Sequence, residues 1–393
     1  MGNRAHRKGY DGVVVTAPVT IPYERYSPKP AHWWVGRALK ALSTRSKLEA
    51  KDIDGLSVSS FTLFPDTAVA LTQHFGLSPR WLDHIPMGGA SGVVALRRAA
   101  RAVAAGDVEV VACVAGDANH VNSFRNTLTA FSRFSQDASY PYGSGGPNAS
   151  FALMTRNYMN AYGVTRRFRA HLRGAARQRI VLSACADEEA AFHDGLLAAR
   201  AVADPVHLFD CVMPCAGAEG FLVMREENAR ALDLPFARIL STIERHNAFP
   251  DDPIQYRGGW ALDKDEFWAM AGVSPDAADL ETYDDYPVIV MMQIEDLGFC
   301  GKGEAAEFVR SRSLTVDGDF PHNTSGGQLS VGQAGAAGGY LGLVEAVRQL
   351  TGEALGAQVE NAKIAAVSGF GMINFDRGLC TAAAVLASGG GDG

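Results

Sequence analysis

The chain has 393 residues, of which 47% are hydrophobic and 20% are charged, and its formal net charge is −7. This length predicts two domains or one duplicated unit with a sizeable core, and the negative charge argues against a general nucleic-acid-binding protein. No window holds the ~20 uninterrupted apolar residues of a membrane span, and the first residues carry no secretion signal, so we expect no membrane partner. The six cysteines lack a disulfide-framework spacing, which favours a reducing, cytoplasmic location.

The same order of elements occurs twice along the chain. A helix, a polar connector and a strand are expected over residues 34–60. The same order returns about 230 residues later, over 267–293, where the strand is less obvious. Residues 88–117 and 326–372 then each read as a glycine-rich loop, a helix, a connector and a strand. Short Val- and Ala-rich strands between helices are typical of an α/β architecture with buried sheets.

The expected N-terminal half covers residues 1–230 and the expected C-terminal half covers 235–388. The first half includes a lid or loop region over about 118–205, and a loop this long inside a compact protein is usually functional. We expect it to form a wide apolar pocket with its aromatic side chains, which are Phe124, Phe131, Phe134, Tyr140 and Tyr142.

Six arginines between Arg166 and Arg179 are typical of a solvated helix face. The alternative is a site that binds the phosphates of a ligand or an acidic partner.

Three segments together are similar to thiolases of the sterol-carrier-protein type: GGASGVVALRRAARAVAAG (88–106), IEDLGFCGKGEAAEFV (294–309) and HNTSGGQLSVGQAGAAGGYLGLVEAVRQLTG (322–352). The resemblance covers nearly the whole chain in order. It implies an α/β protein with the five-layered αβαβα thiolase fold, made of two similar halves and forming a homodimer. It also implies an acyl-CoA substrate, with coenzyme A as a substrate moiety, and a small zinc-ribbon/OB-fold partner subunit. We expect no metal and no permanently bound cofactor.

The residues that a thiolase uses for catalysis are replaced in this chain. A thiolase needs a cysteine thiolate at the start of its central helix and a histidine to activate it. The resemblance places Gly89 at the position of that cysteine and Gln333 at the position of the histidine. The family's His-Asp-Cys-Phe motif falls on Tyr283, Asp284, Asp285 and Tyr286. Ordinary thiolysis through Gly89 is therefore excluded.

Our favoured hypothesis is retro-aldol cleavage of a bulky 3-hydroxyacyl-CoA without an acyl-enzyme, since this reaction needs no thiol. Tyr283, Asp285 and Tyr286 are candidates for moving the proton. Gln333 and backbone N–H groups around Gly88–Ser91 are candidates for holding the enolate oxygen. The tyrosine-based retro-aldolases of this branch share the Tyr-Asp start of the motif and the LGFCGKGEA run.

Two alternatives stay open. One is a thiolase or acyltransferase that acts on 3-oxoacyl-CoA with a relocated nucleophile, for which Cys300 is the best candidate, with Cys113 and Cys380 near strand ends. The other is a non-catalytic acyl-CoA-binding subunit of a complex, because loss of the cysteine and both histidines also fits a site that has decayed.

Several further residues are candidates on position alone. His120, at the root of the lid, is a candidate acid or base. His246 and Tyr256 follow the strand that opens the second half, and His322 and Asn323 precede the GGQLS loop; these four are candidates for substrate binding. Gly88, Gly89 and Ser91 complete the candidate binding residues, and the Ser91 hydroxyl is expected to cap the helix that it begins.

Overall fold

The computed structural model describes residues 9–119, 137, 140–143, 146–164 and 198–390. Within them, one mixed nine-stranded sheet runs through the molecule in the order β3-β2-β4-β7-β1-β8-β11-β10-β9. His120, the arginines 166–179 and the aromatic residues Phe124, Phe131 and Phe134 lie outside the described residues.

The elements follow one another in three groups. The N-terminal part supplies β1 (Val13–Glu24), α1 (Ala31–Ser46), β2 (Gly55–Ser59), α2 (Ala68–Phe75), β3 (Trp81–His84), α3 (Ser91–Ala105) and β4 (Val110–Ala118). Next come α6 (Pro147–Tyr162), the separate pair β5 (Ala201–Ala203) and β6 (Val206–His207), β7 (Ala216–Arg225) and α9 (Glu226–Ala231). The C-terminal part supplies β8 (Phe236–His246), α10 (Trp260–Ala271), β9 (Asp279–Glu281), α11 (Pro287–Asp296), α12 (Ala305–Ser311), α13 (Gly327–Val331), α14 (Gly338–Thr351), β10 (Ile364–Asn374) and β11 (Arg377–Ser388).

Strand pairing repeats outward from the centre of the sheet. β1 and β8 pair antiparallel at the middle, over Val14–Thr16. On one side the sheet continues with two antiparallel pairings, β1–β7 and β7–β4, and then two parallel ones, β4–β2 and β2–β3. On the other side β8–β11 and β11–β10 are antiparallel and β10–β9 is parallel. A single parallel bridge from Leu280 to His322 follows at the place that β3 occupies in the first half.

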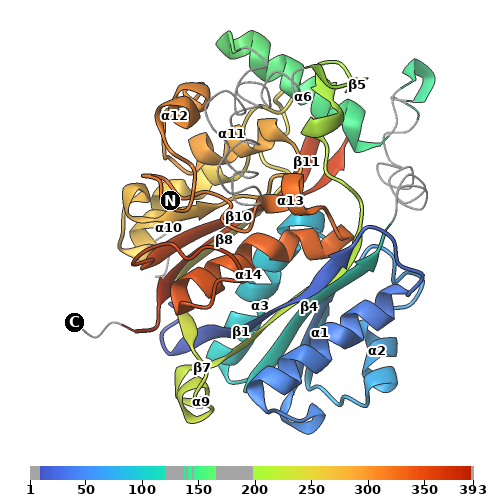
Figure 1. Ribbon diagram of the computed structural model, residues 1–393, viewed down its shortest axis with the longest axis vertical. Coiled ribbons are helices and arrows are strands. Elements are labelled where there is room, and N and C mark those ends of the chain that lie inside the picture. Colours follow the sequence, from blue (N-terminus) through green and yellow to red (C-terminus); the bar gives the residue numbers. More distant parts are fainter. Residues whose placement is uncertain (1–8, 120–136, 138–139, 144–145, 165–197, 391–393) are drawn as a thin grey trace.

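Five layers result from this arrangement, as Figure 1 shows. α3 and α14 form the middle layer. They pack against strands from both halves of the strand order, including β1 and β7 of the first half and β8 and β11 of the second. α1 and α2 cover the outer face of the first side, and α10 and α11 cover the outer face of the second. The expected α/β architecture with five αβαβα layers is confirmed.

The middle helices approach each other more closely than side chains would permit. A Cβ atom added to Gly92 of α3 would lie 2.2 Å from the carbonyl oxygen of Gly339, and one added to Gly339 would lie 2.7 Å from that of Gly88. The glycines therefore allow the start of α14 to pack directly on the start of α3. This contact brings together the two glycine-rich loops that the sequence singled out.

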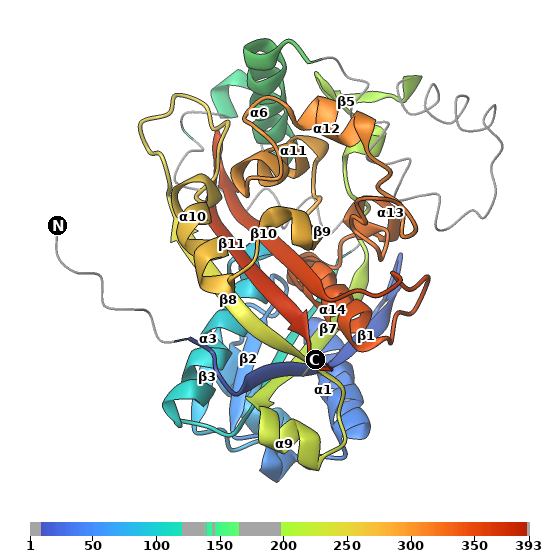
Figure 2. The same cartoon turned by 90° about the vertical axis from the view of Figure 1, so that its left-hand side faces the viewer.

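Helices α6, α11 and α12 gather at one end of the molecule, above β10 and β11, as the second view shows (Figure 2). An ion cluster with two buried carboxylates holds this end together: Lys302 lies 3.0 Å from Glu295 and 2.9 Å from Asp296. The hydroxyl of Tyr158 in α6 donates to Glu295 as well. The IEDLGFCGKG segment thus anchors α6 to α11.

Candidate active site

The loop before α3 is packed too tightly to carry a side chain at Gly89. A Cβ atom there would lie 2.1 Å from Cζ of Tyr283 and 2.4 Å from the backbone oxygen of Phe370 in β10. Carbon atoms in contact normally stay about 3.5–4.0 Å apart. The phenol ring of Tyr283 therefore occupies the volume that a nucleophilic side chain at position 89 would need.

The hydroxyl of Tyr283 belongs to a short hydrogen-bonded array. The Nε2 atom of Gln333 donates one hydrogen to Oη of Tyr283 at 2.8 Å and the other to Oδ1 of Asp285 at 2.8 Å. Two such bonds diverging at the roughly 120° of an amide NH2 group place the two oxygens about 5 Å apart. Because Oη of Tyr283 accepts from Gln333, its own hydrogen is left to donate elsewhere.

The two ends of the array differ in their ionisation. Burial raises the pKa of Asp285 to about 7, and the neighbouring Asp284 carboxylate adds to the effect. Burial and the Asp285 carboxylate also hold the pKa of Tyr283 well above its usual range. Near neutral pH the site therefore combines a carboxyl group that can take up or release a proton with a phenol that stays protonated and donates.

Backbone contacts fix the position of Gln333. Its N–H donates to the carbonyl of Met213 at 2.8 Å, and its carbonyl accepts from the N–H of Cys215 at 3.0 Å. Just beyond it, the Asp117 carboxylate at the end of β4 accepts from the N–H of Ala336 at 2.7 Å and from that of Thr62 at 2.7 Å. The turn that carries Gln333 is thus held by the first half of the sheet.

Several candidate residues hold the Tyr283 segment in place. Oδ1 of Asn323 accepts the N–H of Thr282 at 2.7 Å. Burial lowers the pKa of His322 to about 3, so its ring is neutral, and its Nε2 atom lies 2.8 Å from the hydroxyl of Thr282. Asp284 accepts the backbone N–H of Gln328 at 2.7 Å and so anchors the GGQLS loop. These contacts support the site without reaching the Tyr283–Gln333–Asp285 array.

Tyr286 points to a different element. Its hydroxyl donates to Oδ1 of Asn148 in α6, and its ring stacks on Phe151 with centroids 3.9 Å apart. Asn148 was missed by sequence reasoning, because it follows a glycine- and proline-rich loop and belongs to no motif. Gln328 was missed too: it is 1% exposed, and among the residues that the structure describes neither polar atom of its amide has a hydrogen-bond partner. Its place in the GGQLS run was the signal in the sequence that could have pointed to it.

Two expected roles at the loop are corrected. Ser91 does not cap α3: its hydroxyl donates to the carbonyl of Ile85 and accepts the N–H of Met87, both at 3.2 Å, and so ties the preceding loop. Gln333 is not free to hold an enolate oxygen, because both hydrogens of its amide are already used. Gly88 and Gly89 are both buried, and Gly88 has a left-handed backbone with φ of 53°.

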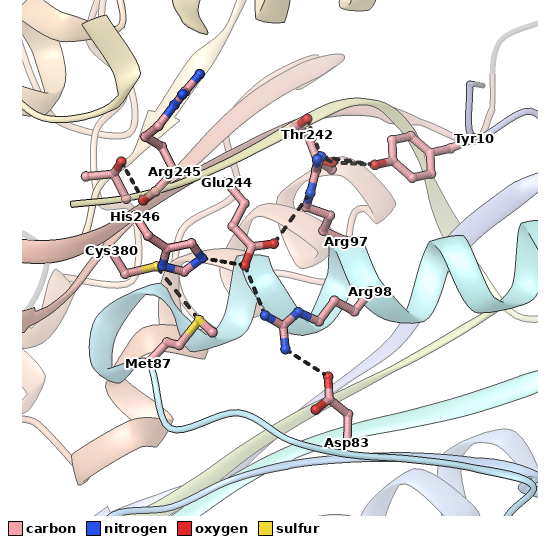
Figure 3. Close-up of polar contacts among 11 residues, drawn as sticks. Tyr10, Asp83, Met87, Arg97, Arg98, Thr242, Glu244, Arg245, His246 and Cys380 are labelled. Atoms are coloured by element: carbon pink, nitrogen blue, oxygen red, sulfur yellow. Dashed lines mark hydrogen bonds and ion pairs between the residues drawn. The ribbon is translucent and has the colours of Figure 1, made fainter. Parts of the chain in front are cut away.

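His246 lies near Met87 of the loop before α3, in the polar network of Figure 3. Its Nε2 atom is 2.9 Å from Glu244, which also pairs with Arg98 of α3 at 3.1 Å. Next to it, Sγ of Cys380 lies 3.9 Å from Sδ of Met87. Tyr256 is further away, with its ring 6.0 Å from Nζ of Lys302 in the ion cluster of α11. Neither His246 nor Tyr256 has a contact with the array.

The described cysteines do not form a thiolate site. They are free thiols at Cys113, Cys211, Cys215, Cys300 and Cys380. Burial raises the pKa of Cys300 to about 12, with a further increase from Glu295, and burial likewise raises that of Cys380 to about 12. Burial holds the pKa of Cys113 well above its usual range. A nucleophilic cysteine needs a lowered pKa, so these three thiols do not suit the relocated-nucleophile alternative.

Comparisons with known proteins agree with the fold. Residues 264–381 match the family described as Thiolase C-terminal domain-like. The chain is 31% identical over 352 residues to a 17-hydroxy-3-oxo-4-pregnene-20-carboxyl-CoA lyase of Mycobacterium tuberculosis, covering 82% of this chain and 87% of the relative. It is 28% identical over 358 residues to a steroid side-chain-cleaving aldolase of Thermomonospora curvata, covering 85% and 89%. Among solved structures, the Ltp2-ChsH2(DUF35) aldolase has a similar fold, with a TM-score of 0.79, 22% identity and coverage of 97% and 98%.

Proposed function

The chain belongs to the sterol-carrier-protein-type branch of the thiolase superfamily, and on that premise we propose that it cleaves a bulky 3-hydroxyacyl-CoA by a retro-aldol reaction without an acyl-enzyme. The observation that carries the proposal is the Tyr283–Gln333–Asp285 array, which lies beside Gly89, the residue that the resemblance aligns with the thiolase nucleophile. Its chemistry, one base and one neutral donor, is the set that this reaction requires.

Asp285 is the proposed base. It is the partly exposed member of the array, and a pKa of about 7 leaves much of it ionised near neutral pH. Its carboxylate takes the proton of the β-hydroxyl, and the β-oxygen forms a carbonyl as the Cα–Cβ bond breaks. The electron pair of that bond passes to the thioester as an enolate. Protonation of the enolate at Cα, by the proton that Asp285 has gained, releases the shortened acyl-CoA and restores the base.

Tyr283 is the proposed donor to the enolate oxygen. Its hydrogen is left free by the bond that it accepts from Gln333, and its raised pKa keeps it protonated through the reaction. Four bonds separate the thioester oxygen from the β-hydroxyl oxygen, which places them at most about 5 Å apart. This spacing matches that of the Tyr283 and Asp285 oxygens, so one substrate can meet both groups. Gln333 acts as the positioning residue between them.

A bulky apolar acyl group is supported by the side chains beside Gln333. Met213, whose carbonyl binds the Gln333 N–H, is 50% exposed, and Val331 is 37% exposed. Leu208 and Phe209 just upstream are 44% and 41% exposed. Apolar side chains left open around polar catalytic groups are typical of a pocket for an apolar ligand. The names of the two steroid-cleaving relatives lead us to propose a steroid acyl-CoA as the substrate.

The assembly and location are proposals as well. The structurally similar Ltp2-ChsH2(DUF35) aldolase carries a DUF35 component in its name, and we propose a small partner subunit of that kind for this chain. We propose a homodimer in which the edge strand β3 meets a second copy, because an edge strand offers unpaired backbone groups. Among the described residues no helix is long and apolar enough to cross a membrane. A cytoplasmic location stays a prediction of the sequence.

The decisive experiment is an assay with 17-hydroxy-3-oxo-4-pregnene-20-carboxyl-CoA in the absence of free coenzyme A, with products identified by mass. We expect a 17-ketone and propanoyl-CoA, and we expect Tyr283→Phe to lower the rate by about 10²–10³-fold while the protein stays folded. Cleavage that occurs only with a 3-oxoacyl-CoA and only with added coenzyme A would instead favour thiolysis. Acyl-CoA binding with no turnover of either compound would favour the non-catalytic subunit.

A further inference from the structure

Asn148, at the start of α6, is a polar group near the site that the array does not use. Its Oδ1 atom accepts the hydroxyl of Tyr286, and the thiol of Cys211 lies 3.8 Å from the same oxygen. Within the described residues its Nδ2 atom has no hydrogen-bond partner. Asn148 is half-buried, so it is not closed off from the surface as a whole.

The chemistry of Tyr286 fixes which way the amide faces. Burial and the carboxylate of Asp285 hold the pKa of Tyr286 well above its usual range, so the phenol is neutral and has a hydrogen to donate. An amide oxygen can accept this hydrogen and an amide nitrogen cannot. The oxygen of Asn148 therefore faces Tyr286, and the two N–H bonds point away from it.

A second contact holds α6 in register with Tyr286. Phe151 stands three residues after Asn148, so both side chains project from the same side of the helix. The Phe151 ring stacks on the Tyr286 ring at 3.9 Å and 21°. Tyr286 directly follows Asp285 in the chain. Its contacts with Asn148 and Phe151 therefore hold the start of α6 close to the segment that carries the proposed base.

The position on the helix favours a negatively charged partner. α6 runs for 16 residues from Pro147, and Asn148 is its second residue. The first turn of a helix has unbonded N–H groups and the positive end of the helix dipole. Both the side chain and the backbone at this point thus suit an oxygen that gains negative charge.

We propose that Nδ2 of Asn148 donates a hydrogen bond to the β-oxygen of the substrate while Asp285 removes the proton from that oxygen. This inference rests on the proposed retro-aldol function and adds a catalytic residue to it. As the O–H bond breaks, negative charge grows on the β-oxygen, and it declines again when the Cα–Cβ bond breaks and the carbonyl forms. The hydrogen bond is therefore stronger in the transition state than in the bound alcohol, and it accelerates the reaction rather than only tightening binding.

The test compares variants that remove the donor with variants that leave it in place. Asn148→Ala removes both the donor and the acceptor, and Asn148→Asp keeps the acceptor for Tyr286 but loses the donor. Tyr286→Phe breaks the same link from the other side and keeps the amide. Asn157→Ala, on the same helix, removes only a 3.4 Å bond to the carbonyl of Ile254 and serves as the matched control.

We expect both Asn148 variants to lower kcat on the steroid thioester by about 10²-fold with KM changed less than about threefold. Tyr286→Phe should lose less than about tenfold, and Asn157→Ala should match the wild type. In Asn148→Asp the new carboxylate should also raise the pH at which the rate reaches half its maximum, whereas Asn148→Ala should leave it unchanged.

Three outcomes separate the possibilities. Wild-type kcat retained within about threefold by either folded Asn148 variant would overturn the inference while leaving the retro-aldol function intact. A loss in Tyr286→Phe as large as that in Asn148→Ala would also overturn it, because the effect would then come from a loosened Tyr286. Failure of the wild-type protein to cleave the thioester would overturn the proposed function itself, and the inference with it.

Discussion

Replacing Gly89 by alanine tests the claim that the Tyr283 ring fills the volume that a side chain at position 89 would need. The added carbon would lie 2.1 Å from Cζ of Tyr283 and 2.4 Å from the oxygen of Phe370. The ring can rotate or shift, but the Phe370 oxygen belongs to the backbone of β10 and cannot yield without moving the strand. Overpacking of this kind typically costs about 1–3 kcal/mol. A shifted ring also moves the Tyr283 hydroxyl away from Gln333, which removes the donor to the enolate oxygen.

We therefore expect Gly89→Ala to lower the unfolding midpoint by a few degrees and the rate of thioester cleavage by about 10²-fold or more. The measurements are thermal unfolding and the product assay without free coenzyme A. Gly356→Ala is the matched control, because no atom lies within 4 Å of the Cβ that it would add. It should leave both quantities unchanged.

A double variant locates the clash. Tyr283→Ala alone leaves a cavity, and in combination with Gly89→Ala that cavity receives the added methyl group. The double variant should then be more stable than the sum of the single effects predicts, by at least about 1 kcal/mol. Additive effects, or full stability and activity in Gly89→Ala, would mean that the ring does not occupy this volume and would refute the reasoning. Gly89→Cys should likewise gain no thiolysis activity.

Three other variants have defined expectations. Asp285→Asn should lower kcat by about 10²–10⁴-fold. The wild-type rate should rise with pH around a midpoint of about 7, because the base acts when it is deprotonated. A wild-type pH profile that is flat between about pH 6 and 8 would contradict this assignment. Cys300→Ala should keep the cleavage rate within about threefold, and a tenfold loss would return this thiol to the mechanism. Gly92→Ala, whose Cβ would lie 2.2 Å from the Gly339 oxygen, should cost about 1–3 kcal/mol of unfolding free energy, and an unchanged denaturant midpoint would contradict the close helix crossing.

Sequence patterns predicted the layers better than the short elements. The loop and helix at 88–105 and the strand Val110–Ala118 have apolar periodicity that is visible locally. The strand of the second repeat was hard to see because β9 has three residues and exists through its pairing with β10. The boundaries at 230 and 235 remain predictions, since the pairing of β1 with β8 makes one continuous sheet of both halves.

At the candidate site, the sequence pointed to residues that the structure brings together, but it did not indicate which contacts each of them makes. Motif position identified Tyr283, Asp285 and Gln333 as candidates, and the structure joins them by hydrogen bonds. Nothing in the sequence indicated that the Tyr283 ring lies against Gly89, because that contact joins loops almost 200 residues apart. For the same reason the burial that makes His322 neutral was invisible among its polar neighbours.

The position of β11 has a consequence for how the chain is made. β11, over Arg377–Ser388, pairs with both β8 and β10 and so joins the second side of the sheet to the centre. A ribosome delivers this strand after every other strand of the sheet, and until then β8 and β10 have no common partner. The nascent chain must therefore keep the apolar face of α3, over Ser91–Ala105, protected for most of its synthesis, which makes early chaperone binding an expected need of this protein.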